Sequence, residues 1–142
     1  MIFNNCSLTI DFQFLNSINH TNMHVDIGTD RLSASNETKS YSTRITLPST
    51  LEIKCSGKDQ NTDTLIDVNG QVIADKVVII KSIVLDNIRI PQRSIDKIIR
   101  LVTDDGQEFY SETIKHNGTI VLDFKYSDVF RQVMHFTRMG NT

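Results

Sequence analysis

Apolar and polar side chains alternate along most of this chain in short runs. The first clear run is residues 7–14, where Leu8, Ile10, Phe12 and Phe14 lie between polar neighbours. A period of two is typical of a β-strand with one buried face. The same period recurs over residues 23–27, 41–47 and 51–55. We therefore expect a protein built from short strands.

Residues 77–90 form the longest apolar stretch, and both of their alternating side-chain sets are mainly apolar. Val and Ile dominate, and such residues favour strands. A helix is the competing interpretation, but no N-cap residue precedes the stretch and β-branched crowding lowers helix propensity. The pattern predicts a central strand covered on both sides.

Turn signals separate the runs. Asn69-Gly70 suits a two-residue hairpin loop, because both residues tolerate positive φ. Asp105-Gly106 predicts a hairpin that leads into a strand over residues 107–113, and Asn117-Gly118 predicts another turn. The polar segment 29–39 is either a loop or a weak edge strand, and it guards a sheet edge or folds onto a neighbouring molecule.

Helical periodicity is confined to two places. After Pro91, a single helical turn near residues 92–97, with Ser94 as its cap, leads into the next strand; the alternative is a strand that begins by Ile99. Residues 127–138 have the spacing of a short amphipathic helix, which would cover an open end or dock on another subunit. The chain is thus predicted to be one all-β domain over residues 1–142, an antiparallel, jelly-roll-like sandwich with a short C-terminal helix.

Composition narrows the partners. The 142 residues carry 15 basic and 17 acidic side chains, so no strong field of one sign is present to attract nucleic acid or anionic lipid. No apolar run approaches the ~20 residues that span a bilayer, and the first residues lack a signal-peptide pattern. We expect no nucleic-acid or membrane partner. Cys6 and Cys55 are expected to be buried free thiols.

Metal and catalytic signatures are weak. Asp59, Asn61 and Asp63 alternate with other residues as the oxygen ligands do at the opening of a calcium loop. However, Thr64 stands at the position of the usual glycine, and Gly70 at the position of the closing acid. Solvated loop residues are the alternative interpretation. The calcium candidates are Asp59, Asn61, Asp63 and Asp67, and no cofactor is expected.

Paired carboxylates at Asp104 and Asp105 fit a turn better than acid–base chemistry, because Gly106 follows them. No nucleophile–base pair is evident, so the sequence predicts a protein that is not an enzyme. Sugar stacking, in the absence of Trp, would depend on tyrosines: Tyr41, Tyr110 and Tyr126.

Several short motifs in the second half of the chain carry a resemblance. They are Gly57-Lys58, Asp63-Thr64, Asp67-Val-Asn-Gly70, Val72-Ile73, Asp75, the spaced residues Val78, Ile80, Ile83, Asp86, Ile88 and Ile90, the later Pro91, the hairpin over residues 98–109 and Asn117-Gly-Thr-Ile-Val-Leu-Asp-Phe124. In this order they resemble small proteins of contractile-tailed, T4-like marine bacteriophages, which are similar to jelly-roll carbohydrate-binding modules. The chain departs from that pattern by lacking the Trp residues of a sugar platform.

The resemblance implies a non-enzymatic structural component of a virion, in the head, neck, tail or a decoration site. Its partners would be other virion proteins and copies of itself, and it would be made in the host cytoplasm. The alternative is a carbohydrate-binding module that takes a glycan, assisted by calcium at the candidates given above.

Overall fold

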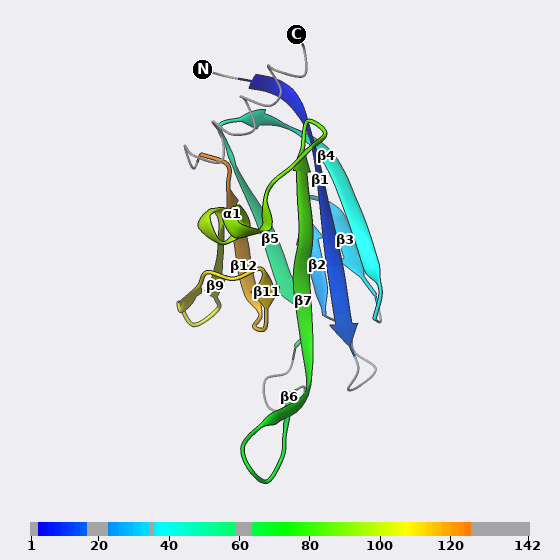
Figure 1. Ribbon diagram of the computed structural model, residues 1–142, viewed down its shortest axis with the longest axis vertical. Helices are drawn as coiled ribbons and strands as arrows, with labels where there is room; N and C mark the ends of the chain where they lie inside the picture. The colour runs from blue at the N-terminus through cyan, green and yellow to red at the C-terminus, as the bar shows by residue number, and fades with distance from the viewer. Residues whose placement is uncertain (1–2, 17–22, 35, 59–63, 126–142) are drawn as a thin grey trace.

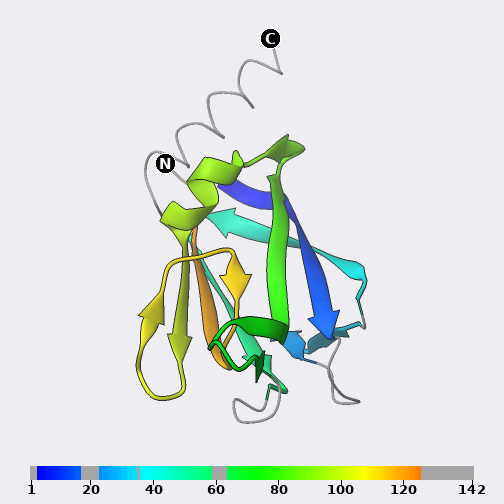
Figure 2. The ribbon, with the colours of Figure 1, turned by 60° about the horizontal axis from the view of Figure 1, so that its bottom comes forward.

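The computed structural model describes residues 3–16, 23–34, 36–58 and 64–125. In this part of the chain, two antiparallel sheets stack as a sandwich and one short helix lies beside them (Figures 1 and 2). The predicted all-β sandwich is confirmed. The predicted helix over residues 127–138 lies outside the described residues.

The first sheet, called sheet A here, has the strand order β11-β7-β1-β4. Two short strands, β6 and β8, also pair with β7. The bounds in sheet A are β1 (Phe3–Asn16), β4 (Thr38–Leu47), β6 (Thr64–Ile66), β7 (Val72–Leu85), β8 (Ile88–Arg89) and β11 (Thr113–Ile114).

Sheet B has the order β10-β9-β12-β5-β2-β3. Its bounds are β2 (His24–Ile27), β3 (Asp30–Ser33), β5 (Thr50–Ser56), β9 (Ile99–Thr103), β10 (Glu108–Phe109) and β12 (Gly118–Asp123). Part of the polar segment 29–39 therefore forms the edge strand β3, and its last residues begin β4.

The core lies between the sheets and follows the alternation in the sequence. Leu8, Ile10, Phe12 and Phe14 are all 0% exposed, as the pattern in β1 predicts. Burying each such side chain contributes about 1.5–3 kcal/mol. Sheet B supplies the facing layer, which includes Val25, Ile27, Ile53, Cys55, Leu101, Ile120 and Leu122.

A β-bulge in β7 moves its core-facing positions from one alternating side-chain set to the other. Phe12 pairs with Ile80 and Asp11 with Ser82, so Lys81 is an extra residue on β7. An extra residue moves every later side chain to the opposite face. The core-facing set of β7 is Val78, Ile80, Ile83 and Leu85. The predicted coverage of both sides is confirmed only in part. On the face away from the core, Val77 and Ser82 are buried, but Ile79 and Val84 are partly exposed, and the bulge residue Lys81 is exposed.

The central strand also ends earlier than predicted. The chain reverses at Asp86 and Asn87, where φ is +49° and +65°, and Leu85 pairs with Ile88. Two consecutive positive φ values close a tight two-residue hairpin. Residues 77–90 are thus two strands, because Asn and Asp tolerate the left-handed region.

The β6–β7 hairpin has a longer loop than its Asn69-Gly70 signal predicts. The Asp67 N–H donates to the Gln71 carbonyl (2.8 Å), and the Gly70 N–H donates to the Asp67 carbonyl (3.0 Å). Only Gly70 has positive φ, +82°, so the loop holds three residues. The β9–β10 hairpin repeats this arrangement, with Gly106 at +90°.

The chain bends at His116 and Asn117, as the Asn117-Gly118 signal predicts, and Gly118 already begins β12. Its backbone lies so close to β9 that an added Cβ would be 2.3 Å from the Val102 carbonyl oxygen and 2.8 Å from the Thr103 Cα. Only glycine fits this approach. The predicted turn therefore lies just before Gly118, and the glycine itself is required by the packing of β12 on β9.

The helix α1 (Gln92–Ile98) matches the predicted helical turn and passes directly into β9. Pro91 occupies the N-cap position, and Ser94, the predicted cap, is buried within the helix. Ile95 and Ile98 face the core, and the helix contacts β9 and β12. The predicted buried thiols are confirmed: Cys6 and Cys55 are free and buried.

Candidate functional site

The chain crosses from one sheet to the other between β10 and β11. Phe109 in β10 pairs with Leu101 of sheet B, whereas Thr113 in β11 pairs with Ile79 of sheet A. The Thr113 N–H donates to the Ser111 hydroxyl (3.1 Å) in the crossing. The predicted single strand over residues 107–113 is therefore wrong. This crossing lies along one open side of the sandwich (Figure 2).

Two surface hollows meet beside this crossing, and His116 lines both of them. One has a volume of about 250 Å³ and is lined by Leu101, Phe109, Ser111, Thr113, Lys115 and His116. The other has a volume of about 210 Å³ and is lined by Thr103, Asp104, Asp105, Gln107, His116 and Asn117. We call the two together the His116 hollows.

An aromatic pair lies in the first hollow. The Phe109 ring stacks on the His116 imidazole with a centroid distance of 4.8 Å and an interplanar angle of 15°. Phe109 is still 39% exposed. An exposed ring beside hydroxyl groups offers both an apolar contact and hydrogen bonds. This combination is characteristic of a site for a small polar ligand with an apolar face.

Carboxylates and amides line the second hollow. The Thr103 hydroxyl donates to the Asp105 carboxylate, and this bond is the main cause that lowers the pKa of Asp105. Hydrogen bonds from backbone N–H groups and the nearby His116 add to the effect. Asp105 therefore stays ionised and acts as a hydrogen-bond acceptor. Its paired neighbour Asp104 lies in the loop, as the turn interpretation predicts.

Hydrogen bonds between Lys58 and the segment after β11 fix one wall of the hollows. The Lys58 backbone N–H donates to Asn117 Oδ1 (3.0 Å), and Asn117 Nδ2 donates to the Lys58 carbonyl (2.6 Å). Lys58 is 5% exposed, and its Nζ donates to the Lys115 carbonyl (2.7 Å). Such reciprocal bonds hold the wall in one conformation before any ligand binds.

The predicted stacking tyrosines do not gather at this site. Tyr110 is 62% exposed, but its hydroxyl bonds Glu108 (3.2 Å), which places it on the other side of β10 from Phe109. Tyr41 packs partly buried against the core. Tyr126 lies outside the described residues. The sequence reasoning missed Phe109 and His116, which the change of sheet brings together with Ser111 and Thr113 in the first hollow.

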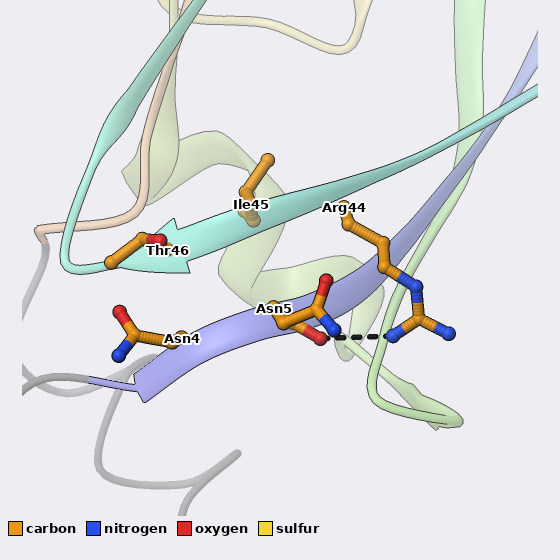
Figure 3. A pocket seen from close by; sticks show the side chains of 5 residues that line it. All are labelled: Asn4, Asn5, Arg44, Ile45 and Thr46. Carbon is orange, nitrogen blue, oxygen red and sulfur yellow. Dashed lines mark hydrogen bonds between the residues drawn. The ribbon is translucent and has the colours of Figure 1, made fainter.

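A third hollow, of about 340 Å³, lies where β1 bulges away from β4 (Figure 3). It is lined by Asn4, Asn5, Arg44, Ile45 and Thr46. Asn5 has φ of +61°, and its carbonyl accepts a bond from the Arg44 guanidinium (2.9 Å). Apart from Ile45 the lining is polar, and it carries no aromatic ring, so its chemistry is less distinctive than that of the His116 hollows despite its larger volume.

Of the calcium candidates, Asp59, Asn61 and Asp63 lie outside the described residues. Asp67 lies in the β6–β7 loop, where its Oδ1 accepts bonds from the backbone N–H groups of Asn69 (2.8 Å) and Gln71 (2.9 Å). Among the residues that the structure describes, no group of three or more His, Cys, Asp or Glu side chains could hold a metal ion. No helix in the same part of the chain is long and apolar enough to cross a membrane.

The fold can be compared with known proteins. No protein-family model and no curated protein matches the chain. A solved structure that does match is the selenomethionine form of vCBM60, from work in which circular permutation links two families of calcium-dependent carbohydrate-binding modules. The TM-score is 0.50 and the identity 12%, over 83% of this chain and 90% of that one. The fold is similar to that of vCBM60.

A second matching structure is vCBM60 in complex with galactobiose, with a TM-score of 0.43 and 16% identity over 82% of this chain and 97% of that one. Both structures are binding modules and not enzymes. At such low identity the similarity to vCBM60 concerns the fold and transfers no binding residues. It supports the carbohydrate-binding-module-like part of the sequence resemblance, whereas the phage origin stays a prediction.

Proposed function

We propose that this protein is a non-catalytic glycan-binding module and that the His116 hollows hold the sugar. The main support is the stacked pair of Phe109 and His116, which keeps an exposed ring beside polar side chains on both sides. The sandwich fold shared with vCBM60 is consistent with this function. The proposed function is the alternative that the sequence raised, and it is preferred here over a virion role.

In this proposal the two hollows make different contacts with the sugar. The apolar C–H face of a pyranose packs on the Phe109 ring, while Ser111 and Thr113 exchange hydrogen bonds with its hydroxyl groups. Asp105 accepts hydrogen bonds, and Gln107 accepts and donates them. Their partners are hydroxyl groups of the next sugar or the outer hydroxyl groups of the same ring.

The test is a glycan array followed by calorimetry on the strongest hit, with Phe109→Ala and Tyr110→Ala compared. Phe109→Ala removes the ring in the hollow and should weaken binding by roughly tenfold or more. Tyr110→Ala is the matched control, since it removes a more exposed ring from the opposite side of β10 and should leave affinity unchanged.

Thermal unfolding of both variants shows whether each remains folded. A blank array, or equal losses in the two variants, contradicts the proposal. Repeating the array with a chelator tests the calcium-assisted form separately: a loss only with chelator would assign a role to the candidates in residues 59–67.

A structural component of a bacteriophage particle is the second candidate. The sequence resemblance supports it, and so does β4, a long strand at the end of sheet A whose outer side no described strand covers. Assembly proteins often meet through such edges. Mass spectrometry of washed particles should then find this chain in fixed copy number, and its absence would rule the role out.

A further inference from the structure

The edges of the two sheets differ greatly in length. Sheet B ends in β10 and β3, which are two and four residues long, and sheet A ends on one side in β11, with two residues. Very short edge strands are a common protection against unwanted pairing. On the other side sheet A ends in β4, which has ten residues. Among the described residues, β4 is the one long edge strand.

The hydrogen-bonding groups on the outer side of β4 can be identified from its register. The Phe14 N–H donates to the Glu37 carbonyl (2.9 Å), and the same register continues as Phe12 with Lys39 and Ile10 with Tyr41. In an antiparallel pair, residues bonded to the partner strand alternate with residues whose N–H and C=O point away. The outward-pointing residues of β4 are Thr38, Ser40, Ser42, Arg44 and Thr46, and all five are exposed.

The side chains in the middle of this edge are held over β1. The Ser40 hydroxyl bonds Asp11, and the Ser42 hydroxyl lies 3.0 Å from that of Thr9. The Arg44 guanidinium donates to Asn5, as Figure 3 shows. Because these three side chains are bonded to β1, they do not cover the outward-pointing N–H and C=O groups of β4. The remaining charge, Lys39, is paired with Glu37 at 3.5 Å.

We propose that two copies of this chain pair through their β4 edges, antiparallel and about a twofold axis at Ser42. In this register every outward-pointing residue finds a partner: Thr38 faces Thr46 of the second copy, Ser40 faces Arg44, and Ser42 faces itself. Any other register leaves outward residues unpaired. The full pairing gives about ten backbone hydrogen bonds.

Charge and chemistry also fit this arrangement. The pairing places no two like charges opposite each other, because Arg44 faces Ser40 and Lys39 faces Ile45. Opposed hydroxyl side chains are favourable cross-strand neighbours. The two sheets A become one continuous sheet with isologous contacts, as closed dimers require. The paired surface does not include the His116 hollows, so this inference is independent of the proposed function.

Sedimentation velocity from low micromolar to near-millimolar protein should show a monomer–dimer equilibrium. Ser42→Pro removes one outward N–H that the monomer does not use, and edge strands tolerate proline there. It should raise the dimer dissociation constant by roughly tenfold or more. Ser42→Ala is the matched control, since it loses the same hydroxyl but keeps the N–H, and it should dimerise like the parent.

A cysteine variant decides the matter even where the proline variant fails to fold. Opposed bonded residues have Cα atoms about 5.5 Å apart, within the range that disulfides span. Ser42→Cys should therefore form a covalent dimer under mild oxidation. Thr46→Cys, also at an exposed position but roughly 27 Å from its own copy in this register, should not. A protein that stays monomeric throughout, or a dimer that Ser42→Cys fails to trap, would overturn the proposal.

Discussion

Gly118→Ala should be among the most damaging small substitutions in this protein. The new Cβ would lie 2.3 Å from the Val102 carbonyl oxygen, so β12 and β9 would have to separate by about 1 Å to restore a normal contact. β12 pairs with β5 on its other side, which leaves little room to move. Losing the bonds near Thr103 and straining the packing together should cost about 3 kcal/mol.

Gly70→Ala provides the comparison. It adds the same atom at a residue with φ of +82° and nothing within 4 Å, so only the backbone strain remains, about 1 kcal/mol. Urea unfolding monitored by circular dichroism should separate the two variants by about 2 kcal/mol. In thermal scans, Gly118→Ala should lower Tm by roughly 10 °C.

An equal decrease in the free energy of unfolding of the two variants would refute the reasoning. The close approach of the β12 and β9 backbones would then add nothing to the cost of the extra Cβ. The slope of the urea transition should stay that of the parent, since neither change alters how much surface unfolding exposes.

Two further predictions concern the thiols and the β6–β7 loop. Burial raises the pKa of Cys6 to about 11 and that of Cys55 to about 12, so these thiols stay protonated in the fold while unfolded thiols ionise near pH 9. The free energy of unfolding should keep its full value below pH 9 and decrease as the pH rises toward 11. In a double Cys→Ala variant this decrease should be smaller. Thiol reagents should label the folded parent slowly. Asp67→Ala should speed amide exchange at Asn69 and Gln71 by about fivefold, roughly 1 kcal/mol, whereas Asp67→Asn, which keeps the acceptor oxygen, should not; equal exchange in both would contradict the structural role of Asp67.

The sequence predicts the architecture because alternation is a local property with a direct physical cause. Leu8, Ile10, Phe12 and Phe14 face the core for the reason that the pattern gives: successive side chains of a strand point to opposite faces. The same rule failed in β7 at Lys81. A bulge depends on the partner strand, here β1, so the β7 sequence by itself does not show where the core-facing set changes.

Glycine signals were ambiguous in a related way. Gly70, Gly106 and Gly118 each follow Asn or Asp in the sequence, yet the first two close three-residue loops and the third makes room for β9. The dipeptide reports that a side chain is absent, but it does not report whether backbone φ or a neighbouring strand requires this.

The candidate site was harder to predict than the fold. Phe109 and His116 are seven residues apart, and they meet because the chain leaves sheet B and joins sheet A between them. No periodicity encodes that change of sheet. Tyr41 and Tyr110 carry the aromatic ring that sugar stacking needs, but their strands do not place them in the His116 hollows.

The crossing between β10 and β11 makes the two layers of the sandwich mechanically dependent on each other at one side. A molecule seated against His116 would touch residues carried by both layers, from Leu101 in one to Thr113 in the other. Occupancy would then oppose sliding of one layer over the other. Ligand binding at this seam would slow the opening of strands far from the contact itself.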